Sequence, residues 1–377
     1  MTKKTSLDQI KIVVFCGALA LFLLLFLVLP KSSYSQTERR YLSEKPHFTV
    51  TRLLDGSYTE DWEAYIADHF PGRTAFVGMY RSTQVALGNS GGSGVYVGSD
   101  GCLFALPNRD ETRLQSNIAA IKSFATTTPA QVTVMVVPSA GAILSEKLPK
   151  NHLSYHDSEE LEAMAEALSP SVSRVDLYQR FRDSEKKDSL YFKTDHHWTS
   201  DGAYLAYTAY CEEKGLSPRQ SSTFIKKDYK GFYGTLYAKS GSWNTPADTL
   251  TLWEPKDSVS VEIHDDSTGK TKTYDSFFFP TAFTGPDPYN IYFDGNHSLV
   301  HIHNEKAEGK LLVIKDSYAN AFVPFLAHHY GDIYMVDLRY YRQNTVSAFL
   351  AENDISDVLF LYSLNQLETD TNFLWLK

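Results

Sequence analysis

Short apolar runs of the kind found in strands buried on both faces recur along the chain. Residues 132–137 form a continuous run rich in β-branched side chains, and similar runs occupy 311–314, 333–336 and 358–361. Segments with a helical pattern separate them, among them 159–168. Because strands covered by helices on both faces lack polar alternation, this pattern predicts an α/β domain built on a parallel sheet.

Between residues 217 and 308 the apolar residues alternate with polar ones instead of forming continuous runs. Three alternating runs lie there, at 259–264, 272–279 and 290–293. Alternation of polar and apolar residues is typical of strands that expose one face. We therefore predict an antiparallel β insertion in this region, which interrupts the α/β domain.

The N-terminus carries a membrane signal. Lysines precede an uninterrupted apolar run at residues 12–29, which is long enough to span a bilayer as a helix and long for the core of a signal peptide. We predict an uncleaved single-pass anchor in the cell membrane with the rest of the chain outside the cytoplasm, although Ser33-Tyr34-Ser35 would also fit a cleavage site. We expect an anchor at residues 1–30, followed by a stalk with a membrane-proximal segment at 31–110. The first part of the α/β domain is expected at 111–216, the insertion at 217–308 and the second part of the α/β domain at 309–377.

The charge balance limits the partners of the chain. It has 36 Lys and Arg against 45 Asp and Glu, a formal net charge of −9, and the sequence has no basic stripe, which argues against a nucleic-acid partner. Aromatic residues make up 14% of the chain. That content is compatible with a surface that stacks on sugars, but tyrosines are also ordinary strand residues.

One block places an acid beside two imidazoles. Residues 194–203 read Thr-Asp-His-His-Trp-Thr-Ser-Asp-Gly-Ala, and the Thr/Ser/Asp cluster is typical of a helix N-cap. On an extended approach, residues two apart point the same way, so Asp195 and His197 share a side. A carboxylate beside an imidazole fixes its tautomer and stabilises the imidazolium. The pair therefore needs a nucleophile from elsewhere in the chain.

Ser317 is the candidate nucleophile. It follows the apolar run at 311–314 and precedes an apolar segment that suits a helix, 321–326. A serine at such a junction presents its hydroxyl at the carboxyl edge of a parallel sheet, where backbone N–H groups can hold an oxyanion. An ordinary helix cap is the alternative for a single serine, and the Asp-x-His pair favours the catalytic interpretation.

The block at 194–203 resembles the signature of the bacterial DHHW-motif proteins, which are similar to the alginate O-acetyltransferase group of the SGNH hydrolase superfamily. The resemblance implies an SGNH-like parallel sheet flanked by helices and circularly permuted, so that the Asp-x-His block precedes the serine block. It implies Ser317 as the nucleophile, His197 as the general base and Asp195 as its orienting acid.

The resemblance also implies an oxyanion site. Asn365 falls where the superfamily places its oxyanion asparagine, together with a backbone N–H of Ser317 or Tyr318. Arg339 takes the place of an oxyanion glycine, and Lys315 replaces the glycine of the superfamily's Gly-Asp-Ser. These two departures bear on the make-up of the oxyanion site.

The first functional hypothesis is a serine acyltransferase or esterase outside the cytoplasm, acting on O-acetyl groups of cell-surface or secreted polysaccharide through a Ser-His-Asp triad and an acyl-enzyme, without a cofactor. The resemblance favours transfer and implies a polysaccharide acceptor and a multi-pass membrane O-acyltransferase partner. The runner-up is a catalytically inactive, anchored protein that binds polysaccharide or assists envelope assembly, since a fold alone does not establish activity.

A metal site is the third hypothesis. His301 and His303 are spaced to share one face of an expected strand, with His297 nearby, and His328-His329 is another pair. Zinc needs about three or four converging ligands. Adjacent histidines on an extended chain diverge, so we predict no catalytic metal.

Overall fold

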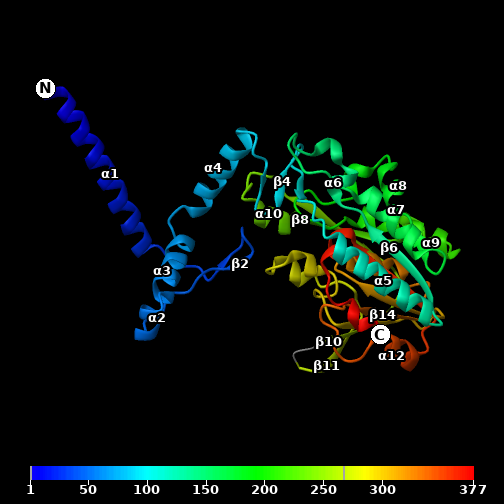
Figure 1. The fold of residues 1–377 in the computed structure, drawn as a ribbon. Helices are drawn as coiled ribbons and strands as arrows, with labels where there is room; N and C mark the ends of the chain where they lie inside the picture. Colours follow the sequence, from blue (N-terminus) through cyan, green and yellow to red (C-terminus); the bar gives the residue numbers. More distant parts are fainter. Residues whose placement is uncertain (1, 266–267) are drawn as a thin grey trace. The chain divides into compact units, whose positions relative to one another are not determined.

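The computed structural model describes residues 2–265 and 268–377, and the chain divides into two compact units. The first runs to Gly88 and includes Gly241–Asn244; the second comprises Asn89–Ser240 and Thr245–Lys377. The first unit is mainly helical (Figure 1), and its elements are α1 (Thr2–Val28), β1 (Tyr34–Ser35), β2 (Arg40–Tyr41), α2 (Val50–Leu54), α3 (Ser57–Asp68) and α4 (Arg73–Ala86).

Helix α1 contains the apolar run. Leu7–Val28 forms a stretch of 22 residues with a mean hydropathy of 2.8, and its side chains are not buried by the rest of the chain. A helix needs about 20 apolar residues to cross the hydrocarbon core. The described residues thus contain one helix that is long and apolar enough for the predicted membrane anchor.

The second unit is built on one eight-stranded sheet with the order β11-β10-β12-β14-β13-β15-β6-β7. Its last five strands are parallel, which confirms the α/β fold predicted from the apolar runs. These five strands are β14 (Asp332–Val336), β13 (Lys310–Lys315), β15 (Asp357–Ser363), β6 (Gln131–Val137) and β7 (Ser173–Val175).

Helices cover both faces of the parallel strands. Side chains of β13 alternate between two cores, with Val313 in one and Leu312 and Ile314 in the other. Burial of each such aliphatic side chain stabilises the fold by roughly 1.5–3 kcal/mol. The first core includes α9 (Ser200–Lys214) and α11 (Ala319–Leu326); the second includes α5 (Glu111–Thr127), α7 (Asp157–Leu168), α12 (Val346–Asn353) and α13 (Leu364–Thr369).

The antiparallel strands of the insertion extend the same sheet. They are β10 (Ser260–Asp265), β11 (Lys270–Tyr274) and β12 (Leu299–His303), and β12 pairs with β14. The strand predicted at 290–293 is wrong, because Pro288–Ile291 forms a 3₁₀ turn instead. The Asp287 side chain accepts a hydrogen bond from the Tyr289 N–H and starts that turn.

Smaller elements complete the second unit. β8 (Ile225–Phe232) and β9 (Asp248–Glu254) form a separate antiparallel pair. Strands β3 (Gly91–Gly92), β4 (Val95–Val97) and β5 (Leu103–Ala105) form a three-stranded antiparallel sheet. The remaining elements are α6 (Ala140–Ile143), α8 (Tyr178–Arg182) and α10 (Thr235–Ser240).

Candidate active site

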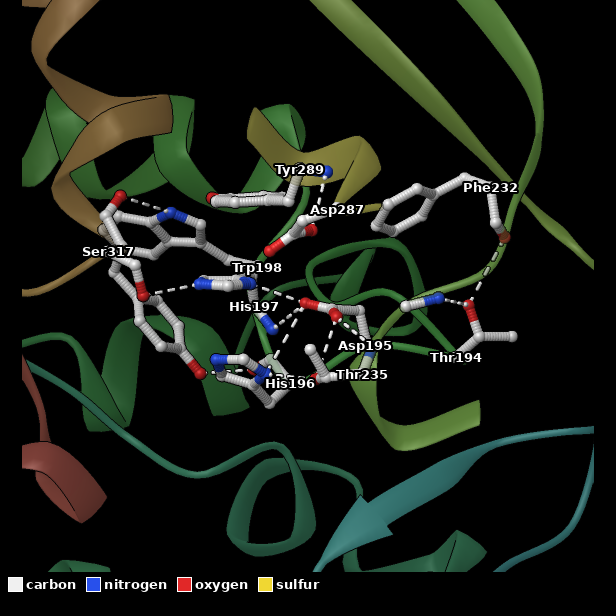
Figure 2. A network of polar contacts seen from close by, with 12 residues as sticks. Thr194, Asp195, His196, His197, Trp198, Phe232, Thr235, Asp287, Tyr289 and Ser317 are labelled. Carbon is white, nitrogen blue, oxygen red and sulfur yellow. Dashed lines mark hydrogen bonds and ion pairs between the residues drawn. The ribbon is translucent and has the colours of Figure 1, made fainter. Parts of the chain in front are cut away.

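The Asp-x-His block and the distant serine lie in direct contact. His197 Nε2 is 2.7 Å from Ser317 Oγ, and His197 Nδ1 is 2.5 Å from Asp195 Oδ1. Figure 2 shows the imidazole of His197 between Ser317 and Asp195. Asp195 is 1% exposed and His197 is 4% exposed. The three groups therefore have the connectivity in which a histidine can take a serine proton while a carboxylate holds the imidazole.

Local structure positions the acid and the histidine on one side. The segment from Tyr191 to Trp198 folds back on itself through an antiparallel bridge, and α9 begins immediately after it. Thr199 caps α9, as predicted, because its hydroxyl accepts a hydrogen bond from the Gly202 N–H at 3.3 Å. The block is therefore anchored to the first turn of a buried helix.

Two cross-links fix the serine block to the histidine block. Ser317 lies between β13 and α11, at the carboxyl edge of the parallel strands. The indole N–H of Trp198 donates to the Tyr318 carbonyl at 3.0 Å, and the Tyr318 hydroxyl donates to the His196 carbonyl. Trp198 is fully buried, as expected for a packing residue. Tyr318, next to the serine, is thus hydrogen-bonded to both residues that flank His197.

Asp195 is held as a carboxylate. Its second oxygen accepts the backbone N–H of Thr235 at 2.7 Å and the Thr235 hydroxyl at 3.1 Å. Burial alone would raise the pKa of Asp195, but the charges of His196 and His197 and these hydrogen bonds outweigh it and hold the pKa well below its usual value. Sequence reasoning missed Thr235, because a lone threonine at the start of a short helix carries no signal.

Tyr289 is a second residue that sequence reasoning missed. Its ring stacks on the imidazole of His197, with centroids 3.8 Å apart and an interplanar angle of 5° (Figure 2). Tyr289 is 4% exposed, so it shields that face of the imidazole from solvent. The stack leaves the imidazole plane little freedom to rotate away from Ser317 and Asp195.

One of the two predicted backbone oxyanion donors is occupied. The Tyr318 N–H donates to Asp316 Oδ1 at 2.9 Å, and Asp316 Oδ2 accepts the N–H and hydroxyl of Ser363. The Ser317 N–H has no hydrogen-bond acceptor within residues 2–265 and 268–377. Asn365 is exposed at the start of α13 and lines the same cleft as Ser317. Of the expected donors, the Tyr318 N–H is thus engaged with Asp316, while the Asn365 side chain lines the cleft.

Lys315 and Arg339, the two departures from the superfamily pattern, belong to one ionic network around Asp337. Arg339 Nη2 lies 2.6 Å and Lys315 Nζ lies 3.7 Å from the same Asp337 oxygen. Lys315 also donates to Asn296 and Asn320. Burial lowers the pKa of Lys315 to about 8. Both cations are thus paired with a buried carboxylate, and Arg339 also lines the cleft.

The cleft beside Ser317 has a volume of about 570 Å³. Its lining includes His196, Tyr318, Asn365, Arg339 and Glu368. Its lining mixes acids, bases, amides and backbone groups, which suits a ligand with many hydroxyl groups. Asp195, His196 and His197 also form a group whose side-chain atoms lie close enough together to coordinate a metal ion. Both ring nitrogens of His197, however, already make hydrogen bonds within the triad.

The model of the family described as DHHW protein matches residues 83–336. The chain belongs to the DHHW family. This DHHW protein is 27% identical over 169 residues to a Pseudomonas putida protein named probable alginate O-acetylase AlgJ, covering 42% of this chain and 44% of that protein. A Pseudomonas aeruginosa protein of the same name is 24% identical over 173 residues, covering 43% and 44%. The chain therefore spans less than half the length of these curated relatives.

Two solved structures share the fold of this DHHW protein. A DHHW family protein from Eubacterium siraeum is 28% identical with a TM-score of 0.65, and the match covers 76% of this chain and 95% of that one. Bacillus cereus PatB1, solved with a sulfonyl adduct, is 25% identical with a TM-score of 0.65, covering 75% and 98%. The fold expected from the DHHW motif is thereby confirmed.

A buried acid in the cleft predicts a pH-dependent stability. Burial, followed by repulsion from Glu160 and Asp157, raises the pKa of Glu368 to about 8. The folded protein therefore keeps a proton that an unfolded Glu loses near pH 4, so the stability contributed by Glu368 falls as the pH rises from about 4 to about 8. Glu368→Gln should raise the free energy of unfolding at pH 8 by roughly 1–3 kcal/mol and change it little at pH 4. Thermal unfolding at both pH values tests this, and equal shifts would contradict it.

Proposed function

We propose that this DHHW protein is a membrane-anchored serine acyltransferase that acts, outside the cytoplasm, on O-acetyl groups of cell-surface or secreted polysaccharide. The observation that carries the proposal is the continuous contact from Ser317 Oγ through the His197 imidazole to Asp195, at the edge of an open cleft. The similarity to proteins named alginate O-acetylase supports the acetyl group and the polysaccharide class.

His197 acts as the general base in the proposed reaction. It takes the Ser317 proton at Nε2 while Oγ attacks the carbonyl carbon of an acetyl donor. The bond from that carbon to the leaving group then breaks, and the imidazolium returns the proton to the leaving group. A sugar hydroxyl next attacks the acetyl-serine with the same base, which releases the acetylated sugar and restores Ser317. Water in place of the sugar gives hydrolysis.

Charge develops on the carbonyl oxygen during both steps. We assign its stabilisation to the N–H of Ser317 and the amide of Asn365, since the Tyr318 N–H is engaged with Asp316. Arg339 is held by Asp337 and contributes positive charge to the cleft wall. Loss of one donor of this kind typically costs about 10²–10³-fold in rate. Asp195 stabilises the imidazolium in both steps.

The proposed partners follow from the anchor and the chemistry. Helix α1 would hold the protein on the membrane, and a multi-pass membrane O-acyltransferase would present the acetyl donor to Ser317. The polysaccharide would lie in the cleft as the acceptor. The net charge of −9 disfavours nucleic acid as a partner.

The acyl-enzyme gives a direct test. The full chain in detergent micelles is mixed with p-nitrophenyl acetate, quenched in acid and measured as intact mass. An acetyl adduct mapped to Ser317 is expected, and Ser317→Ala should abolish it. Ser145→Ala, at an exposed serine far from the triad in sequence, should form the adduct like the wild type. Adding candidate oligosaccharides then separates transfer from hydrolysis. If the wild type forms no adduct with this donor or with a membrane-presented one, an inactive polysaccharide-binding or assembly role replaces the proposal.

A further inference from the structure

We propose that His301, His303 and Asp332 form a zinc site on the main sheet, separate from the acyl-transfer site. One potential ligand atom from each of these side chains lies within 4.8 Å of the others. Asp332 begins β14, whereas Ser317 lies beyond the carboxyl end of the adjacent strand β13. Because β13 and β14 are parallel, the two sites are at opposite ends of the strands.

Strand pairing brings these side chains to one face of the sheet. His301 and His303 are two residues apart on β12, so both side chains point to the same face. Asp332 of β14 is directly opposite His303, and Glu262 of β10 is directly opposite His301. The strands β10, β12 and β14 therefore place four side chains, those of Glu262, His301, His303 and Asp332, close together on one face of the sheet. The strand register fixes the distances between these side chains.

The nitrogen atoms of both histidines converge on one oxygen. His301 Nε2 is 2.8 Å and His303 Nδ1 is 2.9 Å from Asp332 Oδ1. A tetrahedral zinc ion with bonds of about 2.0 Å holds its ligand atoms about 3.3 Å apart. Opening each contact by about half an ångström would therefore let the ion replace the protons that now join these groups. Such a change lies within the reach of side-chain rotation.

The remaining contacts of His301 are those of an oriented metal ligand. Its other nitrogen, Nδ1, faces the Glu262 carboxylate at 3.3 Å. Its ring stacks on Tyr334 with centroids 4.4 Å apart and an interplanar angle of 5°. Ligating histidines usually donate their second N–H to a carboxylate, which fixes the tautomer and the ring orientation. Glu262 therefore orients His301, and Nε2 is left for the metal.

The donor set and its exposure indicate the class of metal. Two imidazoles with one carboxylate suit zinc, whereas magnesium and calcium prefer oxygen ligands. The side chains of His301, His303 and Asp332 are 24%, 46% and 22% exposed, so water has access to complete the coordination. A zinc ion here would link β12 to β14 and so join the antiparallel extension to the parallel strands. Its role is structural.

Zinc binding is measured on the untagged full chain in detergent micelles, stripped with EDTA and titrated with Zn²⁺ against a chromophoric chelator. We expect one site that His303→Ala and Asp332→Asn each abolish, and a rise in the unfolding temperature of the wild type on zinc addition. Glu262→Gln should weaken zinc affinity about 10–100-fold, because it loses only the orienting carboxylate.

Two control variants locate the bound ion. His152→Ala removes an exposed histidine outside the cluster and should bind zinc like the wild type. His197→Ala removes the alternative histidine group at the triad and should also keep the site. Wild-type protein that does not compete with the chelator overturns the proposal. Binding that survives in both His303→Ala and Asp332→Asn, or that is lost in His197→Ala, overturns it as well.

Discussion

Asp195→Asn should slow the acetylation of Ser317 about 10³–10⁴-fold while the protein stays folded. The oxygen of the new amide is drawn to the two donors of Thr235, which lie 2.7 and 3.1 Å from Asp195 Oδ2. Its NH₂ group then faces His197 Nδ1. The imidazole must accept there, so its proton moves to Nε2, and Nε2 can no longer take the serine proton. Stopped-flow release of p-nitrophenol measures the effect.

A second carboxylate provides the matched control for this substitution. Asp201 is exposed in the first turn of α9, so Asp201→Asn removes a charge six residues from Asp195 without touching the triad. It should keep nearly the wild-type rate. If Asp195→Asn retained more than about a tenth of that rate, Asp195 would not set the tautomer of His197, and the proposed roles would need revision.

Gly234→Ala should impair both catalysis and stability. A Cβ at position 234 would lie 2.1 Å from Cβ and 2.2 Å from Oδ2 of Asp195, which is far inside van der Waals contact. Asp195 must therefore move, and its contact with His197 Nδ1 must open. We expect a loss of about 10²-fold or more in kcat/KM, since misplacement by 1 Å costs about this much. The free energy of unfolding should fall by roughly 1–3 kcal/mol.

The glycine of helix α4 is a matched control. The nearest atom to a Cβ at Gly78 is a Trp243 ring carbon at 3.7 Å, an ordinary contact, so Gly78→Ala should leave kcat/KM unchanged. Assays with p-nitrophenyl acetate and thermal unfolding on both variants make the comparison. Wild-type kcat/KM in Gly234→Ala would contradict the close approach of Gly234 to Asp195.

The core of the candidate site could be predicted from the sequence, because each part has a local signal. Asp195 and His197 are two apart before a capped helix, and Ser317 follows a buried strand run. Thr235 and Tyr289 carry no such signal. Thr235 contacts an acid 40 residues away, and Tyr289 acts through ring stacking, which any tyrosine in the chain could provide.

Most of the strands of the main sheet could be located from the sequence, but not all of their pairings could. Continuous apolar runs distinguish strands covered on both faces, and all the runs of this type became parallel strands. Alternation also located β10, but alternation does not say which strand is the neighbour, so the pairing of β12 with β14 could not be foreseen. At 290–293 the same alternation misled, because the turn begun by Asp287 and Pro288 overrides it.

The position of β15 governs the order in which the molecule can be completed. It is the last strand of the eight in the sequence of the described residues, yet it lies between β13 and β6 in the sheet. While the polypeptide emerges, the strands made earlier form two separate groups with unpaired apolar edges, and only residues 357–363 can join them. Assembly of the sheet therefore waits until this strand has been made, and a chain that is cut before it loses the strand that joins the two groups.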